Sequence, residues 1–125
     1  MSLVFQIVTS EVLYFLAIAS GIWLSHTGKP LNPVVLMIHI SLGLGTVVFT
    51  SLVVWSLLQI ETITAAIMIL SISLGALIVG LVASGIILSF DRGNNNQYLR
   101  THNITTILGI IVSTITIYLL AGSSL

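Results

Sequence analysis

Two histidines, each preceded by the same short motif, are the residues of this chain best suited to bind a metal or a metal-containing cofactor. The sequence ASGIWLS at residues 19–25 returns as ASGIILS at residues 83–89. His39 follows the first copy by fourteen residues, and His102 follows the second by thirteen. The matched spacing indicates one helical hairpin used twice, with one imidazole in each copy.

An imidazole inside an apolar membrane span is costly, so it is a functional hypothesis by default. The first hypothesis makes His39 and His102 the two axial ligands of one b-type haem, which needs two neutral imidazoles at one level. Basic groups near the haem propionates would come from Arg100, Lys29 or Arg92. Four glycines beside the histidines either leave room for a flat ligand or serve simple helix contact: Gly21, Gly43, Gly85 and Gly109.

Two other interpretations of the histidines stay open. Three imidazoles can bind copper or zinc, so His26, His39 and His102 form a candidate non-haem metal site, with Asp91 as the one carboxylate placed to orient them. Alternatively, each intramembrane histidine only donates a hydrogen bond to a neighbouring helix. The chain would then be a non-catalytic accessory subunit of a larger membrane complex, without its own cofactor.

The composition indicates an integral membrane protein. The 125 residues are 57% hydrophobic and 5% charged, and a soluble domain of this size could not bury so much apolar surface. Long uncharged segments favour helices, because a helix satisfies its backbone polar groups within one segment. The absence of cysteine excludes disulfides, thiolate metal sites, iron–sulfur clusters and covalent haem attachment. This apolar composition makes the lipid bilayer the expected partner. The formal net charge is zero, so no nucleic-acid partner is expected.

Four hydrophobic stretches are long enough to cross about 30 Å of hydrocarbon, at residues 4–24, 34–58, 62–90 and 98–120. Gly28, Pro30 and Pro33 interrupt helix geometry between the first two, and a polar stretch at 91–97 separates the last two. Short connections place consecutive helices antiparallel. The sequence therefore predicts one all-α transmembrane domain, a four-helix bundle of two repeated hairpins, residues 1–61 and 62–125.

This topology places the linkers 25–33 and 91–97 at the same membrane face. We expect His39 about 9 Å and His102 about 6 Å inside that face, hence at similar depth. Lys29, Arg92 and Arg100 are all of the basic residues, and all lie on this side. The positive-inside rule makes it cytoplasmic, in a multi-pass protein that we expect in the cell membrane.

One acidic residue lies inside a predicted span. Glu11 is about two turns from the opposite membrane face, with Tyr14 one turn further along as a candidate hydrogen-bond partner. A carboxyl group there must be protonated, paired or close to water. It could take part in proton transfer or quinol chemistry, which would make a quinone a further cofactor. Otherwise it bonds a neighbouring helix or lies at the membrane surface.

The layout of Gly21, His39, Gly85 and His102 resembles the four-helix membrane b-type cytochromes. It is similar to one half of a haem A synthase, or to the cytochrome b anchor subunits of membrane oxidoreductases. The resemblance implies ligation of one haem b by both histidines, within a respiratory or oxidase-type complex whose other membrane subunits are partners. Electrons would pass singly between a quinol or another redox subunit and a partner at the face of the two linkers.

The sequence departs from those families in two respects. Di-haem cytochromes carry a second histidine pair near the other face, and this chain has no histidine there, so one haem at most is implied. Haem A synthases have a glutamate one turn before the first histidine, where this chain has Leu36. We therefore expect an electron-transfer or accessory subunit and neither haem A synthesis nor a complete enzyme.

Overall fold

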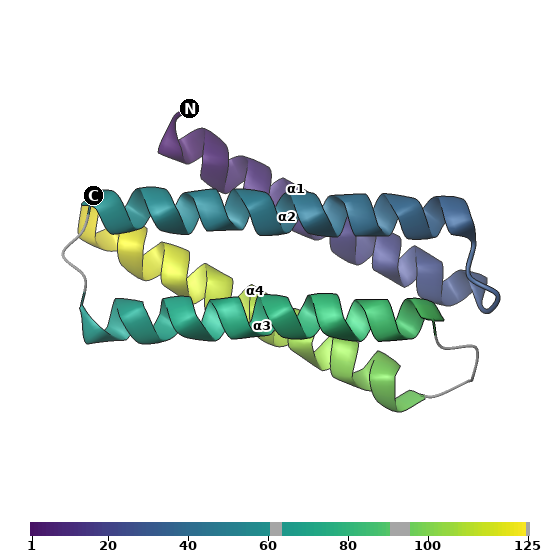
Figure 1. Cartoon of the computed structure of the whole chain (residues 1–125). Helices are drawn as coiled ribbons and strands as arrows, with labels where there is room; N and C mark the ends of the chain where they lie inside the picture. The colour runs from purple at the N-terminus through teal and green to yellow at the C-terminus, as the bar shows by residue number, and fades with distance from the viewer. Residues whose placement is uncertain (61–63, 91–95, 125) are drawn as a thin grey trace. The chain divides into compact units, whose positions relative to one another are not determined.

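The computed structural model describes residues 1–60, 64–90 and 96–124, and every secondary-structure element in them is an α-helix (Figure 1). The four helices are α1 (Leu3–Thr27), α2 (Pro33–Ile60), α3 (Ala65–Phe90) and α4 (Asn96–Ser124). Each is long and apolar enough to cross a membrane. The predicted all-α class is confirmed, and the chain is a multi-pass membrane protein.

Side-chain caps set the helix ends and explain where they differ from the predicted spans. The Ser2 hydroxyl accepts a hydrogen bond from the backbone N–H of Phe5 at the start of α1, and the Asn32 side chain accepts from that of Val34 at the start of α2. Helix α1 ends at Thr27, where Gly28 adopts a φ of 68°, a backbone conformation that favours glycine. The helix therefore includes residues 25–27, which the sequence assigned to the linker.

Helix α2 begins with a proline directly after the Asn32 cap. Pro33 is the first helical residue, as expected, because its missing N–H would have no partner inside the helix at that position. Helix α3 begins at Ala65 with the Thr64 hydroxyl accepting from the N–H of Ile67. Residues 61–63, where the predicted third span begins, lie outside the described part of the chain.

The chain forms two compact units, Met1–Ser56 and Leu57–Leu125. In the first unit α1 and α2 run antiparallel, joined by a short connection after Thr27 (Figure 1). Among the polar contacts between these helices, the Ser10 and Thr50 hydroxyls lie 2.7 Å apart, and the Ser56 hydroxyl donates to the Gln6 side-chain oxygen at 2.9 Å. Hydrogen bonds between helices hold membrane hairpins together where lipid removes the hydrophobic driving force.

The Ser10–Thr50 pair should contribute measurably to the stability of the first hairpin. A double-mutant cycle with Ser10→Ala and Thr50→Val is expected to give a coupling free energy of about 0.6 kcal/mol, since interhelical hydrogen bonds in membranes average about that value and reach at most about 1.7. The measurement is the free energy of unfolding of the full chain in detergent micelles.

A matched control for this cycle is Ser51→Ala. The exposed Ser51 hydroxyl donates only within its own helix, to the carbonyl of Val47 at 2.7 Å. Its removal should change stability by less than about 0.5 kcal/mol. Purely additive effects of the Ser10 and Thr50 changes would contradict the predicted coupling.

The second unit repeats the hairpin with a more apolar contact. Helices α3 and α4 pack along each other (Figure 1). A Cβ atom on Gly80 would lie 3.5 Å from Cγ2 of Thr105, so this glycine permits close approach of the two helices. The position that corresponds to Ser10 in the repeat is Leu74, which is buried. The Ser10–Thr50 hydrogen bond therefore has no counterpart at this place in the second hairpin.

Four polar side chains on α2 and α4 are buried. Thr46, Thr50, Ser113 and Thr116 are all less than a tenth exposed. Most of these hydroxyls donate to a carbonyl of the preceding turn, as Thr46 does to Leu42 at 2.9 Å. Such bonds satisfy the hydroxyl groups locally and give them no chemical role.

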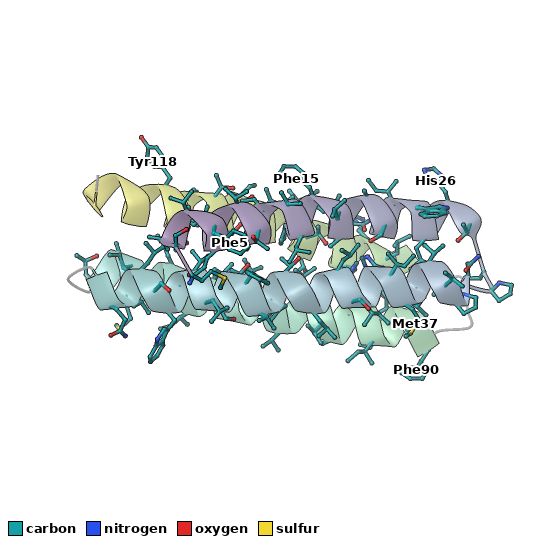
Figure 2. The ribbon with its side chains drawn as sticks, turned by 90° about the horizontal axis from the view of Figure 1, so that it is seen from above. Phe5, Phe15, His26, Met37, Phe90 and Tyr118 are labelled. Carbon is teal, nitrogen blue, oxygen red and sulfur yellow. The ribbon has the colours of Figure 1, made fainter. Side chains whose placement is uncertain are left out.

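Large apolar side chains point outward from the helices (Figure 2). Phe15 is 69% exposed, Phe90 82% and Tyr118 76%. A water-soluble protein would not present aromatic surface to solvent along whole helices. This outer surface fits a lipid bilayer.

Candidate functional site

His39 is held by the preceding helix through its Nδ1 atom. This atom lies 3.0 Å from the carbonyl oxygen of Ala17 and 3.1 Å from the hydroxyl of Ser20. The Ser20 hydroxyl donates to the same Ala17 carbonyl at 2.9 Å. A carbonyl oxygen only accepts hydrogen bonds, so we assign the proton of the neutral ring to Nδ1, which leaves the lone pair on Nε2.

His102 repeats this arrangement in the second unit. Its Nδ1 lies 2.8 Å from the hydroxyl of Ser84, and that hydroxyl donates to the carbonyl of Leu81 at 3.1 Å. Because a hydroxyl has a single hydrogen, Ser84 accepts from the ring when it donates to Leu81. With the hydroxyl donating to Leu81, the ring of His102 has its proton on Nδ1 and its lone pair on Nε2, whereas a hydroxyl that donates to the ring gives the opposite tautomer.

Each imidazole also lies against a glycine. A Cβ atom on Gly21 would lie 3.0 Å from Cε1 of His39, closer than side chains normally approach. A Cβ atom on Gly85 would lie 3.5 Å from Cε1 of His102, an ordinary contact. The room that these two glycines were predicted to leave is therefore occupied by the rings of the histidines themselves.

The other two predicted glycines have different surroundings. Gly43 is one turn after His39 on α2, and a Cβ atom there would meet nothing within 4 Å. Gly109 is buried on α4, seven residues after His102. Gly43 thus has open space beside it, as expected next to a ligand, whereas Gly109 is buried.

The two histidines occupy equivalent positions in their helices. His39 is six residues after Pro33, the first residue of α2, and His102 is six residues after Asn96, the first residue of α4. At 1.5 Å per residue both lie about 9 Å along the helix axis. The fourth helix starts two residues before the predicted span, so each histidine lies equally far from the start of its own helix.

Two of the basic residues proposed for the propionates, Lys29 and Arg100, are exposed. Arg100 is exposed two residues before His102 on α4, and Lys29 is exposed in the connection between α1 and α2. Arg92 lies outside the described residues. These positions are at the same helix ends as the histidines, as the first hypothesis requires.

His26 is exposed in the last turn of α1 (Figure 2). Within the described ranges 1–60, 64–90 and 96–124, no three histidine, aspartate or glutamate side chains are grouped to share a metal ion. Nothing in these residues supports the copper or zinc site of three histidines, and it stays a prediction.

Glu11 and Tyr14 are half-buried on α1. Glu11 directly follows Ser10, whose hydroxyl contacts Thr50. Glu11 and Ser20 are nine residues apart on α1, on opposite sides of the middle of the helix.

The predicted site did not include Ser20 and Ser84. From the repeated motif it included only the glycines, Gly21 and Gly85. The signal was present in the sequence, since Ser20 and Ser84 directly precede the two glycines in both copies. In each hairpin the glycine contacts the imidazole ring, and the serine directly before it reaches Nδ1 at the edge of the same ring. The repeated Ser-Gly pair is thus the histidine-binding feature of each hairpin.

Comparison with known proteins gives no further assignment. No protein-family model matches the chain, and neither a curated protein nor a solved structure matches it.

Proposed function

We propose that this chain is a cytochrome b–like membrane subunit that binds one b-type haem through His39 and His102. The observation that carries the proposal is the repeated hydrogen bond from Nδ1 to the preceding helix. Histidines that ligate metals almost always donate their other ring N–H to a carbonyl, carboxylate or water, which fixes the tautomer and raises ligand basicity. Nδ1 of His39 meets that requirement at the Ala17 carbonyl, and Nδ1 of His102 meets it when the Ser84 hydroxyl donates to Leu81.

The donor set fits a b-type haem. Two neutral imidazoles with the lone pair on Nε2 are the axial ligands that bis-histidine haem needs. The sequence has no cysteine for covalent attachment, so the haem would be held by ligation and packing. Lys29 and Arg100 would pair with the propionates, and Gly43 would let the ring approach the backbone of α2.

Membrane topology supports the participation of both histidines. If all four helices cross the bilayer in succession, α2 and α4 start at the same membrane face. His39 and His102 then lie about 9 Å inside that face, since each is six residues into its helix. One haem with two histidine ligands requires such equal depth.

A haem held there would accept and return single electrons. The chain itself would orient the ligands, exclude water with its apolar helices and neutralise the propionates. We propose a quinol or another redox subunit as the electron donor and an oxidised redox subunit as the acceptor, within a respiratory or oxidase-type complex of the cell membrane. A quinol releases two electrons and two protons as it becomes quinone. Two successive one-electron transfers to the haem would therefore be needed to oxidise one quinol.

A second candidate function has the same hydrogen bonds in its favour. In an accessory transmembrane subunit without a cofactor, the two histidines would serve only to tie α2 to α1 and α4 to α3. The contacts with Ser20 and Ser84 do that. The two functions differ in whether iron is present.

The deciding measurement is a dithionite-reduced minus oxidised visible spectrum of the full chain, isolated from its own membranes in mild detergent. We expect sharp α and Soret bands and a pyridine haemochrome assay that gives one haem b per chain. Protein isolated with its native partners that contains neither haem bands nor iron would contradict the proposal. The accessory function would then explain the histidines.

A further inference from the structure

We propose that Ser20 and Ser84 are positioning residues, which set the tautomer and the ligand strength of the two histidines. This inference rests on the proposed haem function and adds to it the residues that tune the site. Each serine lies one turn above the carbonyl to which it donates, and its oxygen faces Nδ1 of the histidine at 3.1 Å for His39 and 2.8 Å for His102. Each serine contacts Nδ1, whereas the proposed haem ligand is the other ring nitrogen, Nε2.

The geometry makes each serine part of a relay from ring to backbone. In the proposed tautomer the ring N–H donates to the hydroxyl oxygen, and the hydroxyl hydrogen donates to the carbonyl of residue 17 or 81. At His39 the ring N–H also reaches the Ala17 carbonyl directly. Hydrogen bonds in such a chain polarise one another, so the relay increases electron density on the ring. A more electron-rich imidazole is a stronger ligand and favours the oxidised iron.

Burial makes the relay effective. Ser20 is 5% exposed and Ser84 is 6% exposed. Water therefore does not compete for the ring N–H, and the hydrogen bond is stronger than it would be in water. A packing role alone would need neither the hydroxyl nor its donation to the carbonyl.

The same motif contains matched control residues. Ser25 and Ser89 end the two copies of the heptapeptide, and their hydroxyls donate within their own helix, to the carbonyls of Ile22 at 2.8 Å and Gly85 at 2.9 Å. Ser25→Ala and Ser89→Ala remove the same chemical group from the same motif without removing a contact to a histidine. They should leave the haem properties unchanged.

The first test measures haem binding and midpoint potential of the full chain with Ser20→Ala, Ser84→Ala and the two controls. We expect about tenfold weaker haem retention in Ser84→Ala, as for other residues that orient metal ligands. The midpoint potential should become more positive. Ser20→Ala should have a smaller effect, because the Ala17 carbonyl still accepts from Nδ1 of His39. Ser84→Thr keeps a hydroxyl and should restore both properties.

The second test does not need haem. In ¹⁵N NMR spectra of the haem-free chain labelled at histidine, His39 and His102 should have the proton on Nδ1, and Ser84→Ala should change the ring nitrogen shifts of His102. Haem-loaded Ser20→Ala and Ser84→Ala proteins with wild-type potential, retention and tautomer would overturn the positioning role while the proposed function stands. A wild-type chain without haem but with the expected tautomers would overturn the proposed function, and the serines would then only orient the rings.

Discussion

Replacing either His39 or His102 by alanine is expected to abolish haem binding, whereas replacing His26 is expected to leave it intact. The first two residues are the only histidines of the chain inside predicted membrane spans, and both have Nδ1 bound to the preceding helix. Loss of a residue that merely orients a ligand lowers metal affinity by about 10- to 100-fold, so loss of the ligand itself should lower it by about 100-fold or more.

His26 is the matched control because it changes the same residue type outside the site. It lies exposed in the last turn of α1. The measurement is the reduced minus oxidised spectrum of each variant at equal protein concentration. Loss of the bands in only one of the two intramembrane variants would contradict ligation by both histidines. Equal loss in all three variants would indicate misfolding.

A rescue experiment separates the loss of a ligand from the loss of the fold. His39→Gly and His102→Gly leave a space of about the size of the removed ring. Free imidazole added during haem loading should enter that space and restore the α and Soret bands. Helical content measured by circular dichroism should stay at the wild-type value, since each histidine is one residue of a helix of 28 or 29 residues. Variants that keep their helices and are not rescued would count against axial ligation.

The helices and the hairpin repeat could be predicted from the sequence because hydrophobic length and loop residues determine them. Pro33 at the start of α2 is an example, since proline cannot continue a preceding helix and fits a first turn. The ends were harder to place. Helix α1 continues through His26 to Thr27 and ends at Gly28, where φ is 68°, a conformation that glycine adopts without strain. A sequence pattern of apolar residues does not show that conformation.

The side-chain contacts of the histidines could be predicted only in part. Helix α3 is apolar on every side, so hydrophobicity alone does not show which face turns toward α4. The repeated motif does carry this information, but glycine and serine both occur in it. Only the structure shows that the ring lies over Gly85 while its edge meets Ser84. Which of these two residues meets the face of the ring and which meets its edge depends on how α3 is rotated about its own axis. The amino-acid composition of the helix does not determine that rotation.

Gly21→Ala should strongly impair the site, and Gly85→Ala should be tolerated, although the two glycines are equivalent in the repeat. A Cβ atom at Gly21 would lie 3.0 Å from Cε1 of His39, against 3.5 Å for the corresponding atoms at Gly85. Overpacking of this kind typically costs about 1–3 kcal/mol. If this free energy is lost from the binding of haem, because the ring of His39 is displaced, haem binding becomes about 5- to 150-fold weaker, since 1.4 kcal/mol corresponds to a factor of ten.

The ring of His39 has little freedom to relieve the contact. Its Nδ1 is bound to Ala17 and Ser20, which lie on the same helix as Gly21 and within about one turn of it. The hydrogen bonds pull the ring toward α1, and the added methyl group would push it away. Either the bonds lengthen or the two helices separate, and both responses move Nε2. At Gly85 the added methyl group meets the ring at van der Waals distance, so no such conflict arises.

The comparison between the two variants cancels the effect of alanine on the helix itself. Replacing glycine by alanine inside a helix stabilises it by up to about 1 kcal/mol, and both positions are in helix interiors. The free energy of unfolding of the haem-free chain should therefore rise or stay equal in Gly85→Ala and fall in Gly21→Ala. Haem retention of the loaded proteins should follow the same order. Equal behaviour of the two variants would contradict the close contact of His39 with Gly21, and a fall in stability without any loss of haem would show that the contact serves only helix packing.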